Sequence, residues 1–165
     1  MIYSKNLQSY ITPTIEKTVF DVSSYRKITK YMVKDGKIPV GRVSLSDLPN
    51  GVYVEFIENF NPHLYKNFGY VADQIEVEHC LNRNLKEFDI ISKASLNSHA
   101  LHFLRGKRFV ENSINEIVKN IIESTPWGQK FQTAFLSSVD MFMPKEMVQK
   151  YLGIIKALPL LKNVK

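Results

Sequence analysis

The chain has 165 residues, of which 44% are hydrophobic and 12% aromatic, with only seven glycines and seven prolines. This length supports one hydrophobic core, and this composition excludes a disordered or low-complexity chain. The formal net charge of +6 favours anionic ligands in general, such as a nucleotide cofactor, RNA or an acidic protein surface, without selecting among them.

The sequence also limits the compartment. Cys80 is the single cysteine, so no internal disulfide can form, and residues 1–14 lack the apolar core of a secretory signal. The most apolar stretch, residues 152–161, is interrupted by Lys156 and Pro159 and is about half as long as the roughly twenty residues that a membrane span needs. We therefore predict a cytoplasmic protein without a transmembrane helix.

The N-terminal segments favour β-structure after an irregular start. Residues 1–25 hold apolar positions without a clear period, and we expect a strand there, followed by one or two short helices. Residues 28–33 and 38–45 have the composition of strands and flank Asp35-Gly36, a dipeptide typical of hairpin turns. They predict an antiparallel pair.

The middle of the chain predicts a change from strands to alternating helices and strands. Residues 52–57, rich in β-branched and aromatic side chains, follow a turn and extend the pair into a meander. Nothing in residues 69–84 breaks a helix. Residues 88–91 then predict a strand that returns parallel to the preceding one, and residues 97–104 a further helix.

The remainder of the chain is predicted to be helical. Residues 110–122 carry apolar side chains at helical spacing. Residues 129–139 predict another helix, and Pro144 begins a third that runs to about residue 158, since proline is favoured in the first turn.

This pattern divides the chain into two predicted parts. Residues 1–109 form one domain, and residues 110–165 form a helical extension. The apolar stripe of that extension has to be covered. We expect it to pack on the same domain, with a homodimer as the alternative.

The loop before the helix at residues 69–84 is the first candidate for chemistry. Free N–H groups at a helix N-terminus, together with the helix dipole, bind anions, and Gly69 would let an anion approach the main chain closely. Lys66 adds a positive charge. A glycine in such a loop is also often only a turn requirement, so both readings stay open on spacing alone.

Two segments carry a resemblance to a known family. Residues 62–71 (PHLYKNFGYV) resemble the acyl-coenzyme A loop of the GNAT superfamily of N-acyltransferases, in which Arg or Gln, two residues, Gly, one residue and Gly or Ala follow a strand and open a helix. Residues 97–109 resemble the family's later motif of Asn, Ala, an apolar-Tyr pair and a closing Gly-Phe. The resemblance covers about residues 25–109, and the chain is similar to a divergent member.

The resemblance implies a fold and a reaction. The fold would be α/β, a mixed sheet that is antiparallel in its N-terminal half, with a parallel pair around the cofactor, flanking helices and a helical C-terminal tail. The reaction would transfer an acyl group, most simply acetyl from acetyl-CoA, to a primary amine without a metal. The residues implied to bind the cofactor are Phe60, Lys66, Asn67, Phe68, Gly69, Tyr70, Val71 and Asn97.

Four positions depart from the family pattern. Lys66 replaces Arg or Gln, Val71 replaces Gly or Ala, and Arg108 replaces the Gly before Phe109. Leu104 stands where the family carries the Tyr that often protonates the departing thiolate, and leucine has no proton to give.

The acid and the base therefore have to be sought elsewhere. The candidate acids are Tyr65, Tyr70 and His102, or solvent. The candidate bases are Glu55 and Glu58 on the central strand, where a spacing of three predicts that they face opposite sides of the sheet. Glu55 is the first choice because it lies nearer the middle of the strand.

A binding function without efficient turnover is the alternative. Leu104 and the unmatched tail favour a catalytically weak GNAT-fold module that binds acyl-CoA, protein or RNA. Residues 105–108 (RGKR) form a basic cluster that could contact the 3′-phosphate of coenzyme A, RNA or water. Nucleic acid is disfavoured as a partner, the amine acceptor is unknown, and the adjacent His79 and Cys80 do not form a ligand set for a metal.

Overall fold

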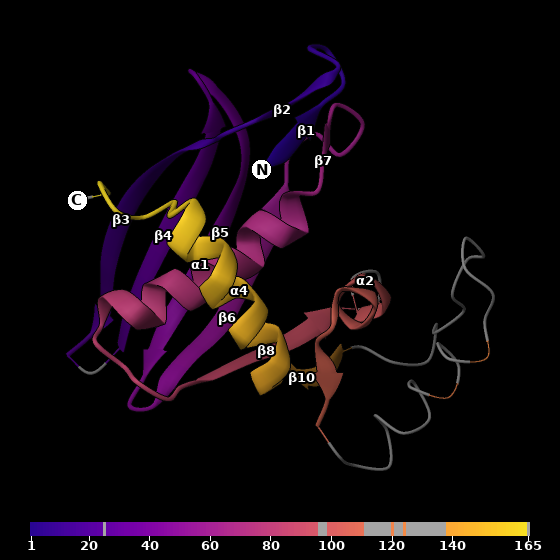
Figure 1. The fold of residues 1–165 in the computed structure, drawn as a ribbon. Coiled ribbons are helices and arrows are strands. Elements are labelled where there is room, and N and C mark those ends of the chain that lie inside the picture. Colours follow the sequence, from indigo (N-terminus) through magenta and orange to yellow (C-terminus); the bar gives the residue numbers. More distant parts are fainter. Residues whose placement is uncertain (25, 96–98, 111–119, 121–123, 125–137, 165) are drawn as a thin grey trace.

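The computed structural model shows a mixed α/β protein with helices on one side of its main sheet (Figure 1). It describes all residues except 25, 96–98, 111–119, 121–123, 125–137 and 165.

Two sheets are present in the described chain. A small sheet has the order β2-β1-β7, made of β1 (Ile2–Ser4), β2 (Ser9–Ile11) and β7 (Tyr65–Lys66). The main sheet has seven strands in the order β3-β4-β5-β6-β8-β10-β9: β3 (Thr14–Ser23), β4 (Arg26–Asp35), β5 (Ile38–Leu48), β6 (Gly51–Asn59), β8 (Asp89–Ser95), β10 (Ser138–Phe142) and β9 (Arg108–Phe109).

The N-terminal half of the main sheet is antiparallel from β3 to β6. The predicted hairpin between β4 and β5 is confirmed, with Gly36 at φ 57° in the turn, a conformation that glycine adopts without steric cost. The helices expected within residues 1–25 are wrong, because this part forms β1, β2 and β3. β3 pairs with β4 along its length but leaves Val19 and Phe20 exposed, so its apolar residues show no simple period.

β6 leads into helix α1 (Phe68–Asn82), and α1 leads into β8, which returns parallel to β6 as predicted. The parallel pairing runs only from Gly51 opposite Asp89 to Val54 opposite Ser92. Beyond that register the two strands have no ladder with each other.

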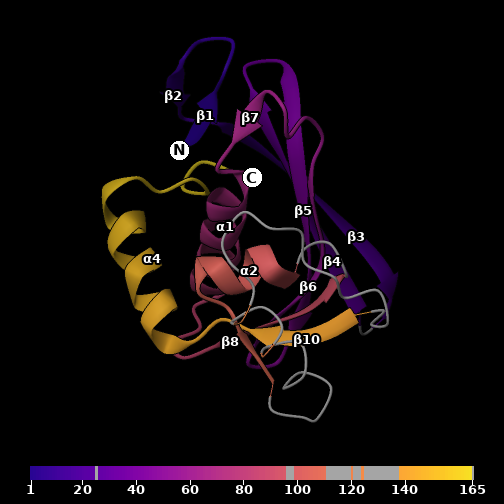
Figure 2. The same ribbon diagram turned by 90° about the vertical axis from the view of Figure 1, so that its right-hand side faces the viewer.

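Helix α1 lies between the main sheet and helix α4 (Lys145–Ala157), as Figure 2 shows. Because both of its sides are covered, α1 is buried almost all around: Val71, Ala72 and Ile75 are at most 1% exposed. A helix buried on several sides lacks the single apolar stripe of a surface helix. Short helix α2 (His99–Arg105) follows β8.

The tail contains a strand that the sequence analysis did not predict. β10 pairs antiparallel with β8 and β9, so the expectation of an all-helical tail is wrong for residues 138–142. In β10, Met141 is buried between exposed Asp140 and Phe142, the alternation of a strand. The predicted helix at Pro144 is confirmed as α4, with Pro144 at its N-cap.

Two predictions fall on parts that the structure does not describe. The predicted helix at residues 110–122 lies almost entirely outside the described residues. Residues 129–137 of the predicted helix 129–139 also lie outside them. The division of the chain after residue 109 stays a prediction, although β10 joins the main sheet and α4 packs on α1. Within the described residues, no helix is long and apolar enough to cross a membrane.

Candidate active site

The gap where β6 and β8 separate contains a pocket of about 670 Å³. Its walls come from the second half of β6, the turn before α1, the first turn of α1, the middle of β8 and helix α2. Cavities of several hundred cubic ångströms commonly bind cofactors and other small molecules. The crossing of β6 into α1 and back to β8 thus places a helix N-terminus at a break in the sheet.

A β-bulge shapes the wall that β6 contributes. Leu45 of β5 pairs with Val54, and the next residue back, Ser44, pairs with Phe56, so Glu55 is the extra residue. Such a bulge bends its strand and redirects side chains, and bulges are common next to active sites.

The bulge changes where the two candidate bases lie. Glu55 accepts a hydrogen bond from Ser46, while Glu58 forms an ion pair with Arg42 at 3.0 Å. Ser46 and Arg42 are four residues apart in β5 and share a face of the sheet. Both glutamates therefore lie on the side away from α1, and the expectation that they face opposite sides is wrong.

Of the two, Glu55 alone lines the pocket. Its Oε1 also contacts a guanidinium nitrogen of Arg26 at 2.5 Å, and its side chain is 23% exposed. The carboxylate is thus held in place by neighbours on β4 and β5 at the edge of the gap.

All three candidate acids line the pocket, in different states. The Tyr65 hydroxyl donates a hydrogen bond to Asp35 at 3.1 Å, and its ring is buried. Tyr70 is 45% exposed at the rim. His102 is buried, with Nδ1 2.8 Å from Nη2 of Arg105. Leu104, at the family's Tyr position, is an exposed part of the lining.

The turn before α1 lines the pocket from Lys66 to Tyr70. Asn67, the N-cap of α1, has φ 67°, which directs the chain sharply into the helix, and Gly69 lies in the first turn. The Lys66 ammonium donates to the Pro62 carbonyl at 2.7 Å and is exposed. The helix N-terminus is thus presented to the pocket.

The other implied cofactor residues are placed less directly. Phe68 lines the pocket and is also buried under Gly41, where an added Cβ would lie 2.6 Å from its ring. Val71 is buried in the core and is not part of the lining. Phe60 is exposed beside Arg42, away from the lining, and Asn97 lies outside the described residues.

Arg105 brings a cation to this helix N-terminus. A Cβ on Gly69 would lie 2.6 Å from Nη1 of Arg105, so only glycine admits the guanidinium so close to the first turn. Arg105 is fixed there because Nε and Nη2 bind the two carboxylate oxygens of Asp73 at 2.8 and 3.3 Å. Its side chain is 13% exposed and lines the pocket.

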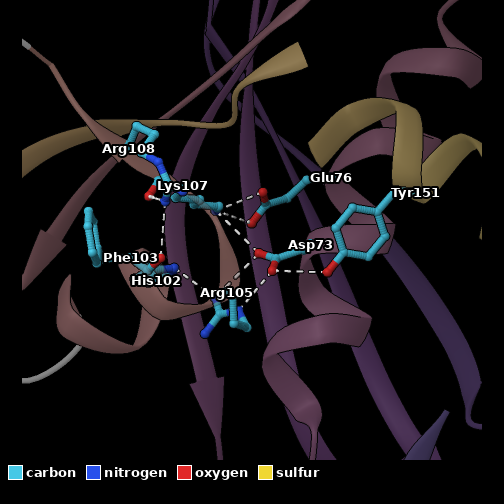
Figure 3. Close-up of polar contacts among 8 residues, drawn as sticks. All are labelled: Asp73, Glu76, His102, Phe103, Arg105, Lys107, Arg108 and Tyr151. Carbon is cyan, nitrogen blue, oxygen red and sulfur yellow. Dashed lines mark hydrogen bonds and ion pairs between the residues drawn. The ribbon is translucent and has the colours of Figure 1, made fainter. Parts of the chain in front are cut away.

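Arg105 belongs to a buried charge cluster that extends from the pocket into the core. We define this cluster as Asp73, Glu76, Arg105, Lys107 and Tyr151 (Figure 3). The Lys107 ammonium is fully buried and donates to the Glu76 carboxylate at 2.9 and 3.1 Å, with Asp73 at 3.4 Å. The Tyr151 hydroxyl, from α4, donates to Asp73 at 3.3 Å. The cluster ties α1, α4 and the segment after α2 together.

The two carboxyl groups of this cluster have pKa values shifted in opposite directions. Burial alone would raise the pKa of Asp73, but the adjacent Lys107 and Arg105 lower it below its ordinary value. For Glu76, burial outweighs the attraction of Lys107, and Asp73 adds repulsion, so its pKa rises to about 7.

These contacts correct the picture of residues 105–108 as an open basic cluster. Lys107 is fully buried and Arg105 is mostly buried, each in ion pairs. Of the three cations, Arg108 alone is exposed, where it lies over the Phe103 ring at 5.0 Å. A patch for an RNA backbone needs several accessible cations, which this segment does not offer.

The pair His79 and Cys80 is structural. His79 lies between the Tyr31 hydroxyl at 2.8 Å and Asp47 at 2.6 Å, and burial lowers its pKa. Burial raises the pKa of the Cys80 thiol to about 12, so it is not a thiolate at neutral pH. No group of three or more metal-ligating side chains occurs within the part of the chain that the structure describes.

One polar group of the pocket was not recognised from the sequence. Ser92, opposite Val54 at the last position where β8 pairs with β6, is 4% exposed and lines the pocket. Its Oγ has no hydrogen-bond partner among the described residues. A serine within a strand matches no motif, and the available signal is a hydroxyl directly after the apolar pair Ile90-Ile91.

Comparisons with known proteins find no relative by sequence but do find similar solved structures. No protein family model and no curated protein matches the sequence. Among solved structures, the chain is similar to a candidate acetyltransferase of the GNAT family from Bacteroides thetaiotaomicron, with a TM-score of 0.40 and 19% sequence identity over 88% of this chain and 77% of that one. The chemistry of the pocket therefore carries the functional proposal.

Proposed function

We propose that this protein is an N-acyltransferase that transfers an acetyl group from acetyl-CoA to a primary amine. The observation that carries the proposal is the pocket between β6 and β8, which is lined both by the first turn of α1 and by Glu55. A helix N-terminus suits the diphosphate of a cofactor, and a carboxylate suits an acceptor amine.

The first turn of α1 would hold the diphosphate. Its free N–H groups and the helix dipole attract phosphate oxygens, and the Arg105 guanidinium adds a fixed cation beside Gly69. Lys66, Asn67 and Tyr70 would complete this end, with Phe60 and Asn97 as further proposed contacts.

The acyl arm would lie along the gap. β6 continues to Asn59, but its ladder with β8 ends at Val54, so its backbone can pair with an extended ligand there. In this proposal the thioester would lie where the strands part. The pocket is lined from both faces of the sheet, by Val54 on the α1 side and by Glu55 on the other.

Glu55 would act as the base. The acceptor amine attacks the thioester carbonyl, forming the C–N bond, and loses a proton to Glu55 directly or through water. The C–S bond then breaks and the electron pair leaves on the sulfur of coenzyme A, which takes a proton from solvent. The proposed setting is the cytoplasm.

Binding without efficient turnover is the second candidate. It is favoured by Leu104, which cannot donate a proton, and by the Tyr65 hydroxyl, which already donates to Asp35. In that case the same pocket would hold acyl-CoA as a ligand only.

Thermal unfolding in the presence of acetyl-CoA, coenzyme A and ATP tests the site itself. The melting temperature should rise with acetyl-CoA concentration, because a ligand that binds the folded state stabilises it by mass action. ATP separates a general affinity for polyphosphate from recognition of the acyl arm. An unchanged melting temperature at millimolar acetyl-CoA contradicts the proposal.

Glu55→Gln tests turnover and the base together. Release of free thiol from acetyl-CoA, measured with a panel of primary amines, should fall about 100-fold in kcat, in the range of general acid–base contributions. Glu58→Gln is the matched control, because Glu58 lies on the same strand and face but outside the pocket. Equal rates for the two variants would remove Glu55 from the role.

A further inference from the structure

The Ser92 hydroxyl is a buried polar group with an unmet hydrogen bond. Ser92 is 4% exposed, and its Oγ has no partner in the described part of the chain. Leaving a buried polar group without a hydrogen bond destabilises the folded protein, and most buried polar groups in native proteins are paired. An apolar residue of similar size would avoid this destabilisation, and because Ser92 also lines the pocket, a bound ligand can supply the missing partner.

The position of Ser92 identifies where that partner lies. Ser92 borders the pocket and occupies the last register position before β6 and β8 separate. It follows Ile90, a core residue on the α1 side, by two positions, so its side chain is on that same side of the sheet. Glu55 is on the other side of the sheet, at the same point along the gap.

A ligand bound between Glu55 and Ser92 would contact the Glu55 carboxylate, a hydrogen-bond acceptor, on one face of the sheet. On the other face it would contact the Ser92 hydroxyl, a hydrogen-bond donor. Glu55 is suited to take a proton from an amine that arrives from its face. A hydroxyl on the α1 side, where the cofactor enters, is suited to donate to an oxygen of the acyl group. The pocket therefore has the Glu55 carboxylate on one face of the sheet and the Ser92 hydroxyl on the other.

We infer that Ser92 is a catalytic residue that donates a hydrogen bond to the carbonyl oxygen of the bound thioester. The inference rests on the proposed acyl transfer. When the amine forms the C–N bond, the carbonyl π electrons move to the oxygen, which becomes negatively charged, and they return when the C–S bond breaks. Ser92 stabilises that charge through its O–H group and keeps its own proton throughout.

Other donors in the pocket are less available for this role. Tyr65 donates its hydroxyl proton to Asp35, and Arg105 is bound to Asp73 at the phosphate end. Tyr70 lies at the exposed rim, where water competes. Leu104 and Leu101 contribute only apolar surface. Among these lining groups, Ser92 alone combines burial, an unused hydroxyl and a place at the parting of the strands.

The test compares Ser92→Ala with Ser23→Ala. Ser23 is a matched control because its Oγ is also buried and without a partner among the described residues, but it lies on β3, away from the pocket. For both variants, the free energy of unfolding, acetyl-CoA stabilisation and thiol release with primary amines are measured. Ser92→Cys, which keeps the shape of the side chain with a weak donor, is measured alongside.

We expect Ser92→Ala to fold with wild-type stability or better, because an unsatisfied hydroxyl has been removed. Its kcat should fall about 100-fold, as for other single donors to a developing oxyanion, while the concentration of acetyl-CoA that gives half-maximal stabilisation stays within about twofold. Ser92→Cys should lose at least about tenfold in kcat, and Ser23→Ala should keep wild-type kcat.

Two outcomes overturn the inference in distinguishable ways. If the wild-type protein releases thiol and either folded Ser92 variant keeps the full rate, the hydroxyl has no part in the reaction, and the proposed acyl transfer stands. If the wild-type protein neither binds acetyl-CoA nor releases thiol, the proposed function fails and the inference fails with it.

Discussion

Two polar regions meet at Arg105 and differ in how completely their groups are paired. In the buried charge cluster, Lys107 contacts both Glu76 and Asp73, and Asp73 also binds Arg105 and Tyr151. In the adjacent pocket, the Ser92 hydroxyl has no partner among the described residues.

This difference separates structural from functional polarity. Burying charges is costly, and such groups are tolerated when neighbours of opposite charge and hydrogen bonds compensate them. The buried charge cluster meets that condition and joins three segments that are distant in sequence. The Ser92 hydroxyl does not meet it, and an unsatisfied buried polar group that also lines a pocket marks a place where a ligand can supply the missing contact.

Of the substitutions considered, Lys107→Met should lower the free energy of unfolding most, because it removes a cation from the buried charge cluster. Without the ammonium, Glu76 loses its cation and Asp73 keeps only Arg105 and Tyr151, so burial of the carboxylates is no longer compensated. We expect a loss of about 3–5 kcal/mol in the free energy of unfolding at pH 8, measured by urea denaturation.

Arg108→Met is the control for this substitution. Arg108 is exposed and lies over the Phe103 ring, so its loss should change stability by less than about 1 kcal/mol. If the two variants lose the same small amount, Lys107 does not compensate the buried carboxylates and the cluster is not a structural device.

Glu76→Gln sharpens the comparison by its pH dependence. The pKa of Glu76 is about 7 in the folded protein, raised by burial, against about 4.3 when unfolded. Between these values the folded state carries the proton and the unfolded state does not, so raising the pH favours unfolding. The stability of the wild type relative to Glu76→Gln should therefore fall from pH 5 to pH 8, by at most about 1.4 kcal/mol per pH unit.

Comparing the wild type with Glu76→Gln separates the effect of Glu76 from that of His79. His79 has a pKa lowered by burial, so its contribution to stability decreases as the pH falls, the opposite sign, and it is present in both proteins. Asp73, with a lowered pKa, loses its contribution only at more acidic pH. A difference that stays constant from pH 5 to pH 8 would show that Glu76 remains ionised beside Lys107.

Local signals in the sequence were sufficient for much of the sheet and its crossover. The turn at Gly36 and the β-branched run in β6 are features of contiguous residues, and they predicted the meander. The unbroken segment 69–84 and the apolar run at residues 88–91 predicted α1 and the parallel return of β8. β3 was missed because it exposes Val19 and Phe20 and so shows no simple apolar period, and β10 was missed because its five residues are too few for a clear pattern, and both strands are defined by pairing with β4 and β8.

The site was less predictable for the same reason. The turn at Gly69 carries a local pattern, but the approach of Arg105 to it depends on Asp73 one turn further along α1. The spacing of three residues predicted that Glu55 and Glu58 lie on opposite faces. That prediction was wrong because of the bulge at Glu55, which arises only when β6 pairs with β5. Burial of Lys107 and the unpaired Ser92 hydroxyl are tertiary facts without a sequence motif.

Gly69→Ala tests the contact with Arg105, where the buried charge cluster meets the pocket. Its expected effect on stability is the smallest. The added Cβ would lie 2.6 Å from Nη1 of Arg105, whose Nε is bound to Asp73, so the guanidinium has to shift. Alanine favours the helix, which offsets that strain, and stability should change by no more than about 1 kcal/mol. The Cβ also obstructs phosphate approach, so the acetyl-CoA Kd should rise about tenfold, near 1.4 kcal/mol.

Gly153→Ala provides the reference for the helix effect alone. Gly153 lies in α4, is exposed, and an added Cβ there meets no atom within 4 Å. This variant should gain about 0.5–1 kcal/mol in stability and bind acetyl-CoA as the wild type does, by calorimetric titration of each protein. A Gly69→Ala protein that binds acetyl-CoA with wild-type affinity would place the diphosphate elsewhere and assign Arg105 to the buried charge cluster alone.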